Sequence, residues 1–359
     1  MDITSIDKNF QLETIKETNV VWKNARDDAF SLHGVFYSEE EGKYRRVPKA
    51  VADTVSDGVA YLSTCTAGGR LRFTTDSDYV AVKVLIPVFV PMRHMTFSGT
   101  AGFSLYENGK FIGIYSLESS HFSKQRDGKI AYEGILYFRT QGQKEVELYF
   151  PLYNGVLELF IGLKEGAAVQ PMPYANGSKP IVFYGSSITQ GGCASRPGND
   201  YISYLSRWLN MDIINLGFSG NGKGEKEIRD YIAGLDVSAF VMDYDHNSPT
   251  PTTLEETHYP LYQAFRNTHK DVPILFITKP DFDNDPTEPI RRAVIEKNYY
   301  RALEEGDTRV GYIDGETLFQ KEDRDACTVD NCHPNDLGFY RMAQTIYPVL
   351  SELLKKAKA

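Results

Sequence analysis

Hydrophobic and polar positions follow two different patterns along the 359 residues of this chain, and the change comes near residue 165. Before it, short runs of β-branched and aromatic residues alternate with turn signals, which is typical of an antiparallel β-sandwich or jelly roll. The predicted strands cover residues 70–75, 79–90, 102–106, 111–116, 145–150 and 156–163. Asn108 and Gly109 predict a tight hairpin turn, because both residues tolerate a positive φ.

From residue 180 onwards, strand and helix patterns alternate, which predicts a parallel sheet covered by helices on both faces. The predicted strands are residues 180–184, 212–216, 239–244, 272–278 and 309–313, and the predicted helices are 200–209, 225–233, 254–268, 289–303 and 335–355. We therefore predict a β-sandwich domain over residues 1–165, a Gly- and Pro-containing linker over 166–179, and an α/β domain over 180–359. In such a sheet, a functional site forms at the carboxyl ends of the strands.

Charge and segment composition exclude several classes of function. The net charge is −9 and no run of Lys or Arg exceeds two residues, so we expect no nucleic-acid partner. The most apolar stretch, residues 79–92, is too short to span a bilayer, and no membrane partner is expected. The first ten residues lack the features of a secretory signal, which predicts a cytoplasmic protein, or a secreted one if a signal has been removed.

The four cysteines are sparse: Cys65, Cys193, Cys327 and Cys332. They form no CxxC pair, so no metal site is predicted. Cys327 and Cys332 are close enough in sequence to form a disulfide in an oxidising compartment. The favoured interpretation is that all four are reduced, mostly buried thiols.

The segment Asp330-Asn331-Cys332-His333-Pro334 places a carboxylate three residues before a histidine, just ahead of the last predicted helix. A serine nucleophile needs a neutral imidazole to take its proton, and that imidazole needs an acceptor that fixes its tautomer. The same spacing also occurs in turns that cap helices. Its meaning therefore depends on a nucleophile elsewhere in the chain.

A candidate nucleophile follows the first strand of the α/β domain, in the string Gly185-Ser186-Ser187. Gly185 permits a tight turn, and Ser187 would begin a helix at the strand end with its hydroxyl exposed. The alternative is that one of the two serines merely caps this helix. The string is not the GxSxG elbow of α/β-hydrolases, because Thr189 stands where the second glycine belongs.

A glycine-rich loop after the second strand, residues 217–223, fits the phosphate-binding pattern GxxxxGK. The third strand ends in Asp243, as a magnesium-binding strand would. Gly224, however, stands where a Ser or Thr should ligate the metal, so nucleotide binding is a remote alternative. The same glycines could instead free backbone N–H groups, such as that of Gly220, to stabilise an oxyanion.

The third strand leads into Asp245-His246-Asn247. The Asn247 amide could donate a hydrogen bond to the same oxyanion, or it could only shape the turn before Pro249. His246 is predicted to line the wall of the site. Arg196 is a candidate contact to a polar substrate, with support of its own loop as the alternative.

Taken in chain order, Ser187, Gly220, Asn247 and the Asp330/His333 pair resemble the four blocks of the SGNH (GDSL-type) hydrolase superfamily. The resemblance covers about residues 178–355 and implies a flavodoxin-like five-stranded parallel sheet flanked by helices. It also implies a Ser187–His333–Asp330 triad that uses no metal or other cofactor. The implied oxyanion hole consists of the N–H groups of Ser187 and Gly220 and the side chain of Asn247.

The strings at residues 185–198 and 215–222 are similar to a subgroup that carries an N-terminal β-sandwich and is often associated with esterases of decorated polysaccharides. Two departures leave substrate preference open. Ser186 replaces the usual Asp beside the nucleophile, and Asp245-His246-Asn247-Ser248 replaces the usual Gly-x-Asn-Asp.

The resemblance implies a serine esterase that acts on small acyl groups, acetyl above all, of a small-molecule or oligosaccharide ester. Aromatic residues of the first domain could bind sugar rings, although packing in the core is the simpler interpretation for each of them. They include Tyr61, Phe73, Tyr79, Phe103 and Tyr106. Alternatives are a lipase or acyl-thioesterase of the same superfamily, and a carbohydrate-binding protein without catalysis; the oligomeric state stays open.

Overall fold

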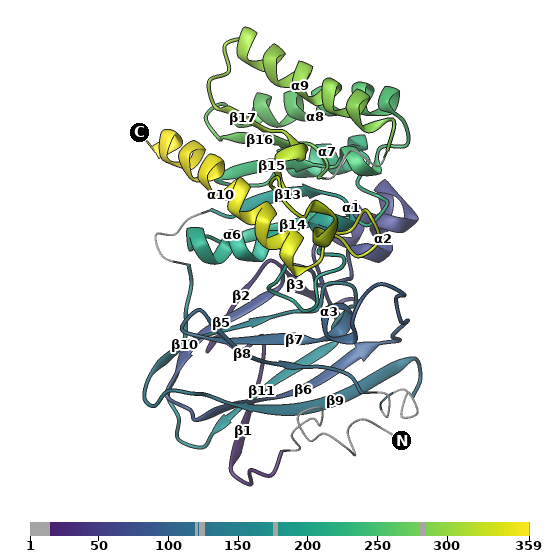
Figure 1. Ribbon diagram of the computed structural model, residues 1–359. Coiled ribbons are helices and arrows are strands. Elements are labelled where there is room, and N and C mark those ends of the chain that lie inside the picture. The colour runs from purple at the N-terminus through teal and green to yellow at the C-terminus, as the bar shows by residue number, and fades with distance from the viewer. Residues whose placement is uncertain (1–14, 119–120, 122–125, 175–178, 281–284, 359) are drawn as a thin grey trace.

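The computed structural model contains a β-rich domain followed by an α/β domain, as the hydrophobic pattern predicts (Figure 1). It describes residues 15–118, 121, 126–174, 179–280 and 285–358. None of the described helices is long and apolar enough to cross a membrane.

Two antiparallel sheets pack face to face in the β-rich domain. One sheet has the order β1 (Val20–Asn24), β11 (Glu158–Lys164), β6 (Tyr79–Pro87), β9 (Lys129–Tyr137). The other has the order β12 (Val169–Pro171), β5 (Arg70–Thr75), β10 (Lys144–Tyr149), β7 (Phe103–Glu107), β8 (Lys110–Tyr115), with β2 (Ser31–His33) also beside β5. A small hairpin, β3 (Phe36–Ser38) and β4 (Lys43–Arg45), stands apart. Apolar side chains from both sheets, such as Phe73 and Val82, fill the space between them.

The predicted hairpin turn at Asn108 and Gly109 is confirmed, with φ of 48° and 73° joining β7 to β8. Part of the predicted linker, in contrast, lies in a sheet, because β12 pairs with β5. Strand β9 was not predicted although its residues alternate in burial as a strand's do. Three short helices were also missed: α1 (Lys49–Val55), α2 (Asp57–Leu62) and α3 (Phe97–Ala101).

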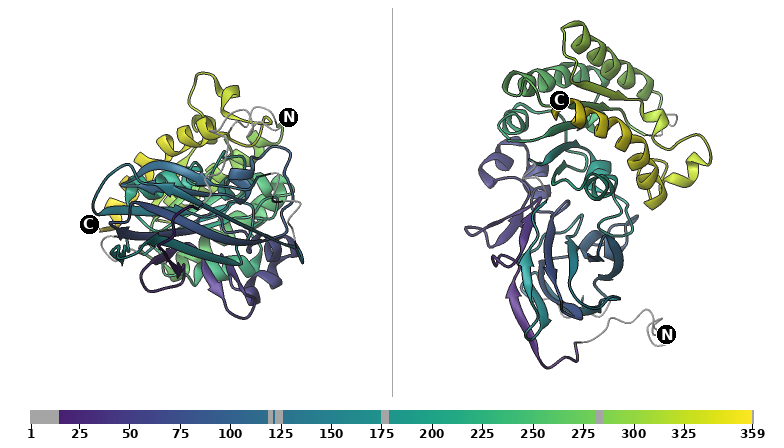
Figure 2. Two further views of the ribbon diagram at one scale, coloured as in Figure 1. Left: turned by 90° about the horizontal axis from the view of Figure 1, so that it is seen from below. Right: turned by 90° about the vertical axis from the view of Figure 1, so that its left-hand side faces the viewer.

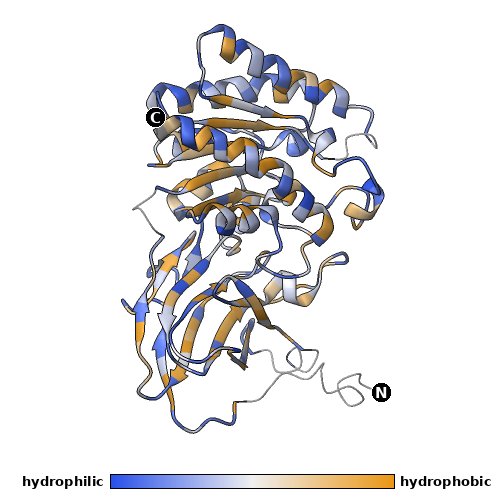
Figure 3. Cartoon of the chain, turned by 60° about the vertical axis from the view of Figure 1, so that its left-hand side comes forward, coloured by the Kyte–Doolittle hydropathy of each residue, from blue (hydrophilic) through white to orange (hydrophobic). Residues whose placement is uncertain are grey.

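The α/β domain contains five parallel strands and confirms the predicted fold class. Their order is β14 (Ile213–Gly217), β13 (Ile181–Gly185), β15 (Ala239–Asp243), β16 (Ile274–Ile277), β17 (Val310–Ile313). Helices α6 (Tyr201–Leu209) and α10 (Asp336–Lys358) cover one face, and α7 (Lys226–Ala233), α8 (Pro251–Thr268) and α9 (Glu288–Glu304) cover the other. The strands are strongly apolar and the helices carry their polar residues outward (Figure 3), as burial of both sheet faces requires.

The two domains stack end to end (Figure 2) and share buried polar contacts. Arg46, from the β-rich domain, donates to the carbonyls of Asn215 and Gly217 at 2.9 and 2.7 Å. The same guanidinium donates to Leu62 O and Cys65 O, at 2.7 and 2.8 Å. Helices α1 and α2 also pack into the apolar core on the α7 side of the sheet. The β-rich domain is therefore fixed against the carboxyl end of β14.

Candidate active site

The predicted nucleophile lies at the first residue of a short helix, α5 (Ser187–Gln190), directly after β13. Ser186, not Ser187, caps this helix: its Oγ accepts from Ile188 N at 3.1 Å, while Thr189 Oγ1 accepts from Ser186 N at 3.0 Å. The capping alternative is thus satisfied by Ser186. The Ser187 hydroxyl is left for another partner.

Gly185 allows this turn because no larger residue fits there. A Cβ on Gly185 would lie 1.9 Å from Thr189 Oγ1 and 2.3 Å from Asp243 O. The strand end, the capped helix and β15 therefore meet at one point. This close packing holds the backbone of Ser187 in place.

Ser187, His333 and Asp330 form one chain of hydrogen bonds. His333 Nε2 lies 2.9 Å from Ser187 Oγ, and His333 Nδ1 lies 2.9 Å from Asp330 Oδ2. The sequence predicted this grouping across the 146 positions that separate Ser187 from His333. The geometry is that of a nucleophile, a base and a group that orients the base.

Asp330 is held in its ionised form by its own loop. Partial burial alone would raise the pKa of this carboxyl, but hydrogen bonds from the backbone and side chain of His333 and from Cys332 N outweigh it and lower the pKa. Asp330 Oδ1 accepts from His333 N at 2.7 Å and from Cys332 N at 3.1 Å. An ionised Asp330 can stabilise a protonated His333.

Gly220, one of the predicted oxyanion donors, lies on a loop that is tied to α5. Phe218 N donates to Gly185 O at 3.0 Å, and Ser219 N donates to Gln190 Oε1 at 3.1 Å. Gly220 has a φ of +67°, and its N–H, like that of Ser187, has no hydrogen-bond acceptor among the described residues. Two backbone donors among the described residues are thus left without an acceptor, one in α5 and one on the loop tied to α5.

Asn247 reaches the same loop from the end of β15. Its Nδ2 donates to Phe218 O at 2.8 Å, which uses one of the two amide hydrogens. A Cβ on Gly222 would lie 3.6 Å from this Nδ2 and 2.2 Å from Gly185 O. The Asn247 amide therefore lies close to the end of β13, with one hydrogen left to donate.

A buried carboxylate below the nucleophile was not predicted as part of the site. Asp243 Oδ2 accepts from Thr189 Oγ1 at 3.0 Å and from Tyr201 OH at 2.7 Å. Burial raises its pKa to about 7, although both hydrogen bonds lower it. This role for Asp243 gives no support to the phosphate-loop alternative, which needs it as a metal ligand. The sequence signal that could have identified Asp243 was its position as an acidic residue at the end of an apolar strand.

His246 lies against the loop that carries the base. Its Nε2 is 3.0 Å from Cys332 Sγ, and burial, together with the nearby charges of Lys279 and His333, lowers its pKa to about 3. His246 is therefore neutral and packs beside Cys332, the residue before His333. Cys332 is not bridged to Cys327, whose Sγ lies 3.4 Å from Arg341 Nη1.

Arg196 is held by the β-rich domain. Its Nη1 donates to Tyr106 OH at 2.7 Å, and its guanidinium lies 3.6 Å from the centre of the Phe111 ring. These contacts favour the alternative in which Arg196 supports its loop and the domain contact. The predicted contact to substrate has no geometric support.

The β-rich domain also reaches the triad, which the sequence did not predict. His94 Nε2 lies 3.7 Å from Asp330 Oδ2. Of the aromatic residues singled out for sugar binding, four are buried: Phe73, Tyr79, Phe103 and Tyr106. Tyr61 is 65% exposed and is the one that can meet a ligand.

Among the described residues, the side chains that could together hold a metal ion are Asp330, Cys332 and His333. Two of these three residues are already engaged in the hydrogen-bond chain to Ser187. The donor set fits acid–base chemistry at Ser187 without further ligands.

Comparison with known proteins matches both domains to families. The family described as GDSL-like lipase/acylhydrolase matches residues 178–351. A domain described as the N-terminus of esterases of SGNH-hydrolase type matches residues 20–169. No curated protein sequence is significantly similar to this chain.

Several solved structures resemble the whole chain. A protein of Bacteroides ovatus described as a GDSL-like lipase is 30% identical, with a TM-score of 0.81 over 94% of this chain and 98% of that one. A salicylyl-acyltransferase from a tetracycline biosynthetic pathway is 20% identical, with a TM-score of 0.74 over 94% and 98%. A family two carbohydrate esterase from Clostridium thermocellum, in complex with cellohexaose, is 13% identical, with a TM-score of 0.61 over 91% and 99%. The last two similarities show the fold alone.

Proposed function

This chain belongs to the GDSL-like lipase/acylhydrolase family and is an ester hydrolase of the SGNH type, and from that premise we propose that it removes small acyl groups, acetyl above all, from carbohydrate. The observation that carries the proposal is the hydrogen-bond chain from Asp330 through His333 to Ser187. It supplies the three roles that acyl transfer to a serine requires.

In the first step, Ser187 Oγ attacks the ester carbonyl while His333 Nε2, 2.9 Å away, takes the hydroxyl proton. Asp330 accepts from His333 Nδ1 and stabilises the imidazolium that forms. His333 then gives the proton to the leaving alcohol, and an acyl-serine remains. In the second step, His333 takes a proton from water, which attacks the acyl-serine. His333 then gives this proton to Ser187 Oγ as the acyl–oxygen bond breaks, so the acid is released and the serine is restored.

The negative charge of each tetrahedral intermediate develops on the former carbonyl oxygen. The N–H groups of Ser187 and Gly220 and the second amide hydrogen of Asn247 are the donors for it. Such donors act strongly because they are fixed before the reaction and need no rearrangement. Gln190 and Gly185, which bind the loop of Gly220, preserve that arrangement.

The carbohydrate part of the proposal has two supports. Tyr61 presents an exposed aromatic ring near the loop of Gly220. Structures with the same two-domain fold include a family two carbohydrate esterase and an acetyl xylan esterase from Butyrivibrio proteoclasticus, at 13% identity each. The activities described for these two structures support acetylated carbohydrate as the proposed substrate of this chain.

The direct test compares Ser187→Ala with the wild type on para-nitrophenyl acetate and on acetylated xylo-oligosaccharides. We expect turnover of both substrates to fall by on the order of 10⁵-fold or more. Ser238→Ala is a matched control, because Ser238 Oγ bonds to Pro180 O at the opposite end of the same sheet, and it should retain full activity.

Equal turnover by Ser187→Ala and wild type would contradict the assignment of the nucleophile. A wild type that binds the saccharides and releases no acetate would favour the alternative of a carbohydrate-binding protein without catalysis.

A further inference from the structure

One loop of the β-rich domain, residues 87–94, borders two cavities and the triad in succession. Its first residues, Pro87 and Val88, line one cavity. Val90 and Met92 line a second cavity, and His94 then lies beside Asp330. The loop thus runs from the far cavity, past the near cavity, to Asp330 of the triad.

The near cavity, of about 360 Å³, adjoins the proposed oxyanion hole. Ser219 and Asn221, on either side of Gly220, line it. So does Tyr153, whose hydroxyl donates to Ser187 O at 3.1 Å. A substrate whose ester lies at Ser187 therefore has this cavity next to it.

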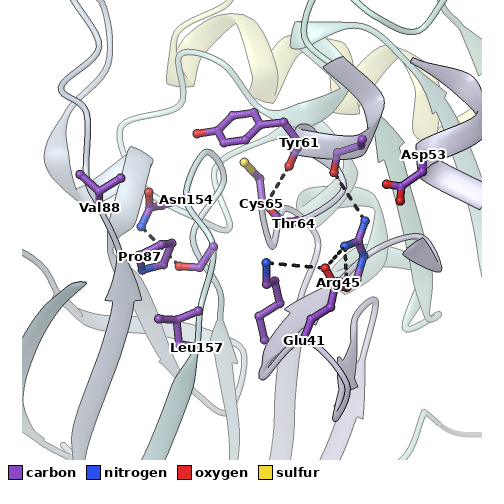
Figure 4. Close-up of a pocket in the computed structure, with 13 residues that line it drawn as sticks. Glu41, Arg45, Asp53, Tyr61, Thr64, Cys65, Pro87, Val88, Asn154 and Leu157 are labelled. Carbon is purple, nitrogen blue, oxygen red and sulfur yellow. Dashed lines mark hydrogen bonds and ion pairs between the residues drawn. The ribbon is translucent and has the colours of Figure 1, made fainter. Parts of the chain in front are cut away.

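The far cavity has a volume of about 340 Å³, and its lining residues are drawn in Figure 4. Both cavities are lined by Tyr61, Cys65 and Asn154, so they meet at these residues. Helix α2, which carries Tyr61, approaches the oxyanion loop closely: a Cβ on Gly58 would lie 2.1 Å from Asn221 Oδ1. The Tyr61 ring is 65% exposed at the junction.

The far cavity is lined by both ionic and apolar groups. Glu41 accepts from Arg45 Nη1 at 2.8 and 2.6 Å, and Lys43 Nζ lies 3.6 Å from Glu41 Oε1 (Figure 4). Pro87 and Leu157 form an apolar part of the wall. An alkyl chain placed here would remove water from these charged groups and give them no hydrogen bonds in return, which is unfavourable.

We propose that the two cavities form one groove that binds an oligosaccharide chain. The ester-bearing sugar lies at Ser187, the next units follow the near cavity and stack on Tyr61, and a distal unit bonds to Glu41, Lys43 and Asn154. Sugars suit such a lining, because a pyranose has an apolar face for the ring and hydroxyls for the charged groups. This inference rests on the proposed function and adds a preference for long chains.

The test measures acetate release from acetylated xylose, xylobiose and xylotetraose, with para-nitrophenyl acetate as the short substrate. Wild type should show a kcat/KM that rises with chain length. Tyr61→Ala should raise KM for acetylated xylotetraose about tenfold, equivalent to about 1.4 kcal/mol. Its kcat for this substrate should not change, because Tyr61 stabilises substrate and transition state equally.

Two further variants sharpen the result. Lys43→Ala should also raise KM for the tetraose and leave acetylated xylose unaffected, because only a long chain reaches the far cavity. Tyr300→Ala is the matched control, since Tyr300 is a helical tyrosine, 54% exposed, on α9 of the other domain. Xylotetraose without acetyl groups should inhibit hydrolysis of para-nitrophenyl acetate by wild type and by Tyr300→Ala more strongly than by Tyr61→Ala.

The outcomes separate this inference from the proposed function. If wild type hydrolyses acetylated xylose and xylotetraose equally and Tyr61→Ala alters neither, the groove inference is overturned and the proposed function stands. If wild type cleaves para-nitrophenyl acetate but no acetylated saccharide, both are overturned. If Tyr61→Ala impairs only para-nitrophenyl esters of longer fatty acids, the groove holds an acyl chain and the oligosaccharide assignment is wrong.

Discussion

Replacing Asn247 by alanine gives the most quantitative test of the proposed oxyanion hole. Two interactions are removed at once. One is the hydrogen bond from Nδ2 to Phe218 O at 2.8 Å, which exists in the resting protein. The other is the bond from the second amide hydrogen to the oxyanion, which forms only when the tetrahedral intermediate does.

The two losses differ in size and in what they affect. The resting bond is partly buried, and losing it should cost about 1 kcal/mol of stability, or roughly 2–4 °C in Tm. Loss of an oxyanion donor typically raises the activation free energy by about 3 kcal/mol, so kcat should fall about 100- to 1,000-fold. KM should change little, because the donor acts mainly in the transition state.

The assay is steady-state hydrolysis of para-nitrophenyl acetate at a temperature where the variant is folded, as thermal melting establishes. Asn298→Ala is the matched control: it removes a buried amide whose Nδ2 lies 3.2 Å from His258 Nδ1, on helices away from Ser187. It should lose comparable stability and keep its kcat. A kcat for Asn247→Ala within about threefold of wild type would refute the assignment, because a functioning donor is worth far more.

Three further predictions concern the surroundings of the site. Arg46→Met leaves the carbonyls of Leu62, Cys65 and Gly217 without this donor. The free energy of unfolding, measured by guanidinium denaturation, should therefore fall by about 3 kcal/mol or more. A fall of less than about 1 kcal/mol would contradict this role of Arg46. The pKa of buried Asp243 is about 7, which lies above the pKa of roughly 3.9 of an aspartate in the unfolded chain. Between these two values the folded state binds one proton more than the unfolded state. The free energy of unfolding therefore falls as the pH rises from about 4 to about 7. Asp243→Asn should flatten that slope by up to about 1.4 kcal/mol per pH unit in urea denaturation, and an unchanged slope would show that Asp243 does not titrate there. Because Cys327 and Cys332 are not bridged, a reductant should change neither Tm nor activity, and a fall in either would show that a disulfide forms.

Much of the candidate site could be predicted because it depends on local pattern and chain order. The strands that end at Gly185, Gly217 and Asp243 are short apolar runs with glycine or polar residues after them. Parallel strands bring their carboxyl ends to one edge of the sheet, so the residues after them meet there whatever the details of packing. The Asp330/His333 pair was predictable for another reason, since both residues belong to a single turn.

Other residues could not be assigned in the same way. Asp243 fitted a metal-binding pattern, and only the contacts from Thr189 and Tyr201 give it a structural role. Arg196 follows the nucleophile closely in sequence, yet its guanidinium packs on an aromatic ring of the other domain. For these residues the nearest neighbours are far away in the chain, and periodicity carries no information about them.

The sequence by itself determined the two domain types, the strands and helices of the α/β domain, and the order of the nucleophile, the oxyanion donors and the Asp330/His333 pair. These features follow from side-chain periodicity and from residues a few positions apart, which act over one turn or one strand. Only the tertiary structure decided that Tyr61 faces the oxyanion loop and that His94 reaches Asp330. Those contacts depend on how the domains are joined, and buried bonds such as that of Arg46 to Gly217, 171 positions apart, fix the joint.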